Sequence, residues 1–335
     1  MVLAVILLFA MVLPLNAGIL GDPSREALIR SIVDMRFLHR YTEAEATIDS
    51  LRAEFPNDPA PLFLKGSNLH DHMTHREDYR DIDRMNAVLD SAILLAGKDL
   101  SDPWNLWIVG SSLGYKAMAE VEKGGYLSAY STSREALGYL KSAMKSPQTR
   151  ADAALGAGGY FYWVSNSLGF LTYLPLVPDN RDEGKTLLKE AFDKSRYSRD
   201  AAAHALVYVF CKSGELDSAR VYRDYVARKY PSSLLPLWYD LSIAEAEKNL
   251  ARYFTAAEKL AEALDTLGLE QGVNALEIHH YSAIAARDLK LWDRAVFHCD
   301  QVIRLGREGD LKSRFKNEIK DCIAIRRLAL EKAPK

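Results

Sequence analysis

A short phrase recurs along this chain and restricts what the chain can fold into. It consists of a bulky or aromatic residue, two mostly polar residues and a small residue, and an apolar or small residue follows seven positions later. Seven residues is about two turns of α-helix, so both positions share one helix face. The phrase therefore predicts helices that pack that face on a neighbour. It stands at Tyr41–Ala44, Leu216–Ala219, Tyr253–Ala256 and Trp292–Ala295, and it is followed by Leu51, Val226, Ala263 and Val302.

Looser copies of the seven-residue step lie between the first two phrases and complete a repeat. The successive anchors are 41, 51, 48, 35, 37 and 39 residues apart, which is the period of a helical repeat. Pro56 and Pro231 each follow an anchor by twelve residues, where a proline ends a helix. We therefore predict an all-α solenoid of about seven helical hairpins. The anchors are Ala44, Met85, Ala136, Gly184, Ala219, Ala256 and Ala295.

The unit from Ala201 to Ser232 carries the pattern best, with Gly214 at the expected turn and Ala219 where its two helices meet. On these residues the chain resembles the tetratricopeptide-repeat (TPR) family over most of 24–305, although Val207 replaces the family's usual small residue. The resemblance implies a right-handed α-solenoid whose first helices line a concave groove for a protein or peptide. The segment 163–191 is also similar to mitochondrial outer-membrane members linked to inclusion-body clearance, which implies a scaffold role.

The last residues are expected to close the repeat domain. We predict TPR-like repeats over 22–309 and a capping helix with its tail over 310–335. An apolar stripe on one side of this segment faces a basic stripe on the other, as the end of a solenoid requires. The apolar stripe is Leu311, Phe315, Ile319, Cys322 and Ile323, and the basic one is Lys312, Lys316, Lys320 and Arg327.

The first 17 residues form an uncharged, apolar stretch that ends in Asn16 and Ala17. This length and composition predict a signal peptide, with cleavage after Ala17, and hence an exported protein that is periplasmic or secreted. A retained N-terminal membrane anchor is the alternative, although the stretch is short for a ~30 Å hydrocarbon core.

Charge and cysteine content narrow the classes of partner. The 43 basic and 45 acidic residues give a net charge of −2, without the basic excess that a nucleic-acid-binding protein uses against phosphates. We therefore expect no nucleic acid as a partner. The three cysteines match no metal motif and are interpreted as buried apolar residues, with a Cys299–Cys322 disulfide as an open alternative.

The centre of the chain has 26 residues without a formal charge between Asp152 and Asp179. Three interpretations remain open: a buried first helix of the fourth hairpin, an aromatic surface for a partner, and a membrane span, which the glycines and prolines disfavour. Large aromatic residues on first helices are candidates for binding, because such residues contribute strongly when a partner buries them. The candidate partner-binding residues are Trp104, Trp107, Tyr160 and Trp163.

A weaker candidate site is the histidine-rich stretch that begins at His70. In a helix, Asp71, His75 and Asp78 share a face and, together with His72, offer mixed nitrogen and oxygen ligands for a metal. Side chains exposed near a hairpin turn explain the stretch equally well, and no catalytic or phosphate-binding motif accompanies it. In His279-His280 we expect one packed and one exposed ring, because adjacent residues point to different sides of a helix.

The sequence thus favours a non-catalytic, exported scaffold that binds a protein or peptide partner, with no cofactor and with attachment to a membrane-associated complex left open. Two alternatives have different requirements. A substrate-binding component of a transporter needs an enclosed aromatic pocket, and a metal-dependent hydrolase needs three converging ligands.

Overall fold

The computed structural model describes residues 18–167, 179–266, 272–307, 309 and 311–333. Within these residues all regular structure is helical, and each helix from α1 to α13 packs on the one that follows it. The helices form seven hairpins: α1 (Glu26–Phe37) with α2 (Tyr41–Glu54), α3 (Ala60–Arg76) with α4 (Ile82–Ala96), α5 (Pro103–Glu122) with α6 (Tyr126–Ala143), α7 (Arg150–Ser167) with α8 (Arg181–Lys194), α9 (Arg199–Ser213) with α10 (Leu216–Lys229), α11 (Leu235–Ala246) with α12 (Leu250–Thr266), and α13 (Val273–Asp288) with α14 (Trp292–Leu305).

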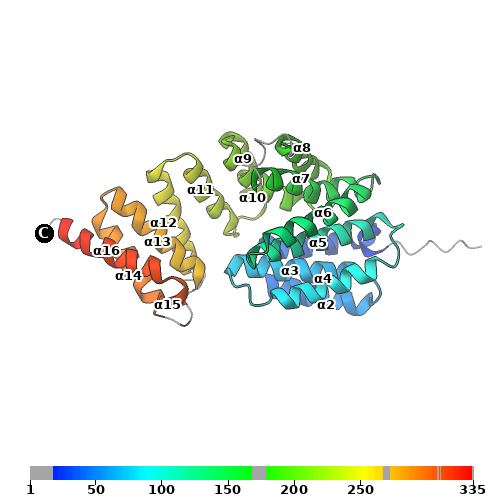
Figure 1. Cartoon of the computed structure of the whole chain (residues 1–335), viewed down its shortest axis with the longest axis horizontal. Helices are drawn as coiled ribbons and strands as arrows, with labels where there is room; N and C mark the ends of the chain where they lie inside the picture. Colours follow the sequence, from blue (N-terminus) through cyan, green and yellow to red (C-terminus); the bar gives the residue numbers. More distant parts are fainter. Residues whose placement is uncertain (1–17, 168–178, 267–271, 308, 310, 334–335) are drawn as a thin grey trace, which may run out of the picture.

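Short segments complete the two ends. Two single turns of 3-10 helix, η1 (Ile19–Gly21) and η2 (Pro23–Arg25), precede the first hairpin, and α15 (Leu311–Arg314) and α16 (Lys316–Lys332) follow the last one. Figure 1 shows the hairpins following one another in chain order, from α2–α6 on the right, past α7–α10 at the top, to α13–α16 on the left. The predicted all-α solenoid of about seven hairpins with a C-terminal capping helix is confirmed.

The same tight turn joins the two helices in five of the hairpins. One residue takes a left-handed conformation, and the next backbone N–H reaches back five residues, as from Glu215 to the carbonyl of Phe210 at 2.9 Å and from Arg40 to that of Met35 at 2.8 Å. This Schellman geometry satisfies carbonyls that a helix end leaves free. The left-handed residues are His39, Gly124, Gly214, Lys248 and Lys290.

The anchors of the repeat lie in the second helix of every hairpin, and all of them are buried. Ala44, Ala219 and Ala295 are completely buried, and so are their partners seven residues later except for Leu51, which is 2% exposed. Small side chains at these positions let the two helices approach closely. The seven-residue step therefore marks the faces that hold each hairpin together.

The sixth hairpin departs from the predicted register. Helix α12 begins at Leu250, so Tyr253 rather than Ala256 holds the fourth position, which the small residue occupies in α2, α10 and α14. Leu260, seven residues after Tyr253, is fully buried, whereas Ala263 is only half-buried. The predicted anchor, Ala256, therefore lies about one helical turn too far along the sequence. The error arose because Ala256 and Ala257 are small residues within α12 and match the repeat phrase.

The capping helix α16 packs on α13 and α14. Cys322, Ile325 and Ala329 form its buried stripe, while Ile323 is 55% exposed. The predicted inward position of Ile323 is therefore wrong: it lies one residue after Cys322, which turns it by ~100° away from the neighbouring helices. Cys299 and Cys322 are buried in one apolar cluster as free thiols.

Candidate partner-binding surface

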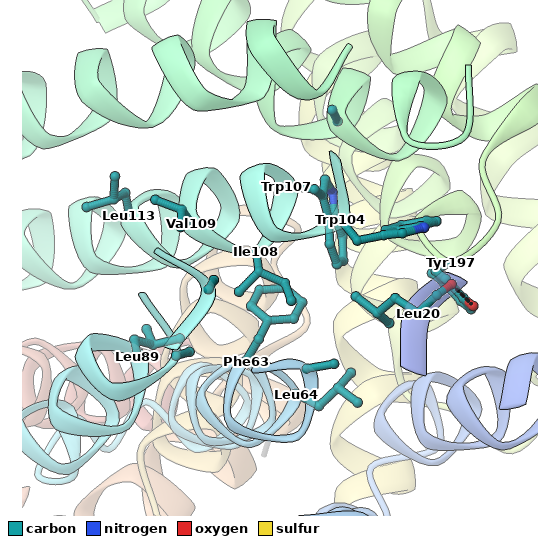
Figure 2. Packing of buried hydrophobic residues seen from close by; sticks show 14 of the residues in the cluster. Leu20, Phe63, Leu64, Leu89, Trp104, Trp107, Ile108, Val109, Leu113 and Tyr197 are labelled. Carbon is teal, nitrogen blue, oxygen red and sulfur yellow. Dashed lines mark hydrogen bonds between the residues drawn. The ribbon is translucent and has the colours of Figure 1, made fainter. Parts of the chain in front are cut away.

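Trp104 and Trp107, two of the four aromatic candidates, belong to the apolar core. They are 3% and 7% exposed and pack edge to face with ring centroids 5.7 Å apart. Figure 2 shows Trp107 near Phe63 and Trp104 near Leu20 and Tyr197, whose hydroxyl donates a hydrogen bond of 2.8 Å to the Leu20 carbonyl. Both indoles hold the first hairpins together, and neither offers a free face to a partner.

The first hairpin also contacts the loop that joins the fifth hairpin to the sixth. Tyr230 stacks on Phe37 with centroids 5.1 Å apart, and its hydroxyl donates to Asp34 at 2.6 Å. The Nε2 atom of His39 lies 3.3 Å from the backbone nitrogen of Leu234. The side chains of the first hairpin that make these contacts are therefore occupied within the chain.

The four candidate metal ligands take part in separate contacts. Asp71 accepts from the guanidinium of Arg36 (Nε to Oδ2, 2.9 Å), and Asp78 is paired with Arg80 through two Nε contacts of 2.8 and 3.0 Å. His72 stacks on Tyr41 and His75 on His39, with centroids 4.9 and 4.0 Å apart. In the part of the chain that the structure describes, no group of three or more His, Cys, Asp or Glu side chains could hold a metal ion.

Both histidines of the His279-His280 pair in α13 are buried. His279 and His280 are 3% and 8% exposed, so the expected exposed ring is absent. The Nδ1 atom of His279 lies 2.9 Å from that of His298, whose Nε2 contacts the carboxylate of Glu258. Burial lowers the pKa of His279 to about 4 and also lowers the pKa of His298, which the carboxylate of Glu258 opposes. The two rings and Glu258 form a hydrogen-bonded chain between α12, α13 and α14.

One group of exposed apolar side chains lies on the third and fourth hairpins, and another, Ile323, Leu328 and Leu330, lies on α16. Tyr126 and Leu127, at the start of α6, are 70% and 89% exposed, although each has a large apolar surface to bury. They follow the turn at Gly124 and Gly125, on the same edge of the solenoid as the ends of α5 and α7. We call the following set the hairpin-3/4 surface: Met118, Val121, Tyr126, Leu127, Tyr130 and Trp163.

Two glycines extend this surface along the first helices of both hairpins. Gly114 precedes Met118 by four residues in α5, and Gly159 precedes Trp163 by four residues in α7. A Cβ added at either glycine would meet nothing within 4 Å. A glycine inside a helix costs about 1 kcal/mol relative to alanine, and no neighbour among the described residues requires it here. Each helix therefore shows bare backbone next to a large apolar side chain, which lets another backbone come close.

The two remaining aromatic candidates lie at or beside this surface. Trp163 is 39% exposed and packs edge to face on the buried Tyr162. Tyr160 is half-buried; burial and the hydroxyl of Tyr130 on α6 raise its pKa. Tyr160 and Trp163 were predicted from the sequence, whereas Tyr126 and Leu127 were not. The sequence does contain a signal for this pair, because Leu127 stands at a position of the repeat phrase that is normally polar.

Other predictions concern parts of the chain that the structure covers incompletely. Residues 1–17 and most of the apolar central loop, 168–178, lie outside the described residues. Among the residues that are described, none of the helices is both long and apolar enough to cross a bilayer. The first helix of the fourth hairpin, α7, is described from Arg150 to Ser167, with Ala153, Ala154 and Ala157 in the core.

The geometry defines the protein as an α-solenoid of TPR-like hairpins stacked in chain order. No family model matches the chain, and no curated protein matches it. Among solved structures, the chain is similar to a tetratricopeptide repeat protein from Parabacteroides merdae: the sequences are 12% identical, the alignment covers 90% of this chain and 100% of that one, and the TM-score is 0.42. This match does not support the fainter similarity to mitochondrial members.

Proposed function

We propose that this protein is a non-catalytic scaffold that binds a protein or peptide partner through the hairpin-3/4 surface. Stacked hairpins expose long helical faces, and proteins with this architecture use such faces for binding. The single observation that carries the proposal is the pair Tyr126 and Leu127, which leave 70% and 89% of their surface in solvent at a hairpin edge.

The energetics favour a partner at this position. Aromatic side chains contribute most to binding when a partner buries them completely, and the surface offers Tyr126, Tyr130 and Trp163. Covering apolar area stabilises a complex by roughly 25 cal/mol per Å². Leu94 on α4, which is 74% exposed and lies outside this set, is an ordinary isolated exposed side chain.

The two alternatives have less support. A transporter component would enclose the central aromatic residues in a pocket, but Trp163 lies on an exposed helix face. A metal-dependent hydrolase would require converging ligands, but Asp71 and Asp78 are each paired with an arginine. A binding role requires neither arrangement.

We further propose that the protein acts after export, on the strength of the apolar segment 1–17. N-terminal sequencing of protein recovered from a fractionated cell tests this proposal. A mature chain that begins at Gly18 supports a cleaved signal. An intact N-terminus in the membrane fraction would favour the anchor instead.

Site-specific photo-crosslinking tests the location of the binding surface. A photoreactive amino acid would be introduced at position 127, at position 163 and, as a matched control, at position 94 of the full chain. We expect crosslinks to one partner from positions 127 and 163 and none from position 94, although Leu94 is more exposed than Trp163. Equal crosslinking from all three positions, or crosslinking only from position 94, would refute the assignment.

A further inference from the structure

The last helix, α16, lies where the first helix of an eighth hairpin would lie, at the left-hand end of the molecule in Figure 1. Each of α5, α7, α9 and α11 packs on both helices of the hairpin before it, and α16 likewise packs on α13 and α14. In the seven complete hairpins a second helix then packs along the first. Among the described residues, no second helix follows α16 to pack along it.

A groove of about 610 Å³ runs between α14 and α16, at the side of α16 where a second helix would pack. Its apolar side chains are Ile303 on α14 and Ile323 and Leu330 on α16. Ile323 and Leu330 lie seven residues apart on one face of the helix and are 55% and 53% exposed. A helix that closes a solenoid normally turns a polar face outward, so this apolar face indicates a further contact.

The charged side chains that border the groove include more cations than carboxylates. Three arginines, Arg307, Arg326 and Arg327, line it together with Asp300 and Glu331. Arg326 pairs with Asp300 at 2.6 Å. Within the described residues, Arg307, Arg327 and Glu331 make no ion pair. Two exposed arginines are therefore left against one exposed carboxylate.

The complete hairpins show what matches such arginines. In the fourth hairpin, Arg150 on the first helix pairs with Glu190 on the second helix at 2.7 Å. Between hairpins, Arg84 on α4 pairs with Glu45 on α2, also a second helix, at 2.9 Å. In both pairs the carboxylate lies on a second helix whose apolar side packs on its neighbours. A second helix beside α16 would likewise suit Arg327 with a carboxylate on its flank.

A second copy of α16 suits the groove less well. If two copies pair antiparallel, so that Ile323 of one meets Leu330 of the other, Arg326 and Arg327 of both copies lie in the middle of the contact. If they pair in parallel about a two-fold axis, each arginine meets its own copy. Like charges at the centre of an interface oppose association. The apolar face and the charges together favour a helix of different sequence that carries acidic residues beside an apolar stripe.

We propose that the groove between α14 and α16 binds an acidic amphipathic helix of a partner protein, which takes the position of a second helix and forms an eighth hairpin with α16. The helix covers Ile303, Ile323 and Leu330, and its carboxylates pair with Arg327 and Arg307. Burial of the apolar side chains supplies most of the affinity, and the ion pairs select the partner. The site lies beyond the seventh hairpin and does not depend on the hairpin-3/4 surface.

A synthetic peptide with the sequence of α2, residues 41–54, is the probe for this groove. It is a second helix of this fold and carries four carboxylates and one arginine. Its apolar face consists of Tyr41, Ala44, Ile48 and Leu51. We expect fluorescence anisotropy to show saturable binding of the labelled peptide to the full chain. Absence of saturable binding would overturn the proposal.

A control peptide with the same apolar face tests the role of charge. It carries Glu43→Gln, Glu45→Gln and Asp49→Asn, which remove three of the four carboxylates. We expect it to bind at least fivefold more weakly than the acidic peptide, because the arginines of the groove lose their partners. Equal binding of the two peptides would contradict an acidic partner.

Variants of the full chain locate the binding. Ile323→Ser/Leu330→Ser changes only exposed side chains, so it should fold, which circular dichroism checks, and it should weaken binding of the acidic peptide at least tenfold. Leu94→Ser, at an exposed leucine of α4, is the matched control and should leave binding unchanged. Arg327→Gln should weaken binding of the acidic peptide several-fold and leave that of the control peptide unchanged. Equal binding by the wild type and the double variant would refute the site.

Sedimentation equilibrium of the full chain tests the rival occupant, a second copy. We expect the wild type and Ile323→Ser/Leu330→Ser to have the same state of association. A wild-type dimer that this double variant dissociates would show that a second copy covers the groove, and it would overturn the proposal.

Discussion

The imidazole ring of His39 stacks on that of His75, with the ring centroids 4.0 Å apart and the planes inclined by 15°. Both rings are half-buried at the place where the first two hairpins meet the loop before α11. Two histidines this close cannot both carry a proton without strong repulsion. Burial lowers the pKa of His39 to about 3 and that of His75 to about 4; His75 lowers the pKa of His39 further, and His72 lowers that of His75.

This stack predicts that acid weakens the fold. An unfolded histidine titrates near pH 6.5, so below that pH the unfolded chain binds protons that the folded chain excludes. The free energy of unfolding should therefore be highest above pH 6.5 and fall as the pH drops toward 4, by up to about 1.4 kcal/mol per pH unit for each histidine. Urea unfolding between pH 7.5 and 4.5 measures the slope.

The His39→Gln/His75→Gln double variant isolates these two rings from the carboxylates. Between about pH 6.5 and 4.5, its free energy of unfolding should depend less on pH than that of the wild type. Above about pH 7, the two proteins should show the same dependence on pH. Identical slopes for the two proteins would show that the stack is not the source of acid sensitivity.

A pair of glycines sets the distance between α7 and α8. A Cβ on Gly184 would lie 2.8 Å from the carbonyl oxygen of Gly158 and 2.8 Å from the backbone nitrogen of Tyr162. Backbone atoms cannot yield as a flexible side chain does, so Gly184→Ala should destabilise the protein by roughly 2 kcal/mol or more. Gly159→Ala, on the open side of α7, is the matched control and should stabilise by about 0.5–1 kcal/mol. Thermal unfolding compares them, and equal effects would contradict the close contact.

The buried carboxylate of Asp152 fixes the start of the fifth hairpin. It is 2% exposed and accepts backbone N–H groups from Arg196, Tyr197 and Ser198 at 2.8–2.9 Å. Asp152→Ala leaves these three donors without acceptors and should cost about 2–4 kcal/mol of stability. Denaturant unfolding checks this value against Asp182→Ala, whose side chain is fully exposed. A loss below about 1 kcal/mol would mean that water replaces the carboxylate.

The repeat could be predicted from sequence because it is local. A small residue and its partner seven positions later lie on one helix, and burial of both needs only the neighbouring helix. The phrase failed in the sixth hairpin, where Tyr253 takes the place of the small residue. The copy of the phrase in the third hairpin, Tyr126-Leu127-Ser128-Ala129, was also missed, because Leu127 is apolar where the other copies mostly have a polar residue.

The contacts across the solenoid could not be predicted in the same way. His39 meets Leu234 across 195 positions and Tyr230 meets Asp34 across 196, and such pairs depend on the curvature that all intervening hairpins add together. The same limit explains Trp104 and Trp107, which are on a first helix as expected but face the core, because η1 and Tyr197 cover them.

The binding claim is tested most directly by the affinity for the partner that crosslinks to position 127. We predict that Tyr126→Ser/Leu127→Ser raises Kd at least tenfold in calorimetry, since removal of a buried aromatic anchor typically costs more than 1 kcal/mol, and that Leu94→Ser leaves Kd unchanged. An unchanged Kd in the folded double variant would contradict the account.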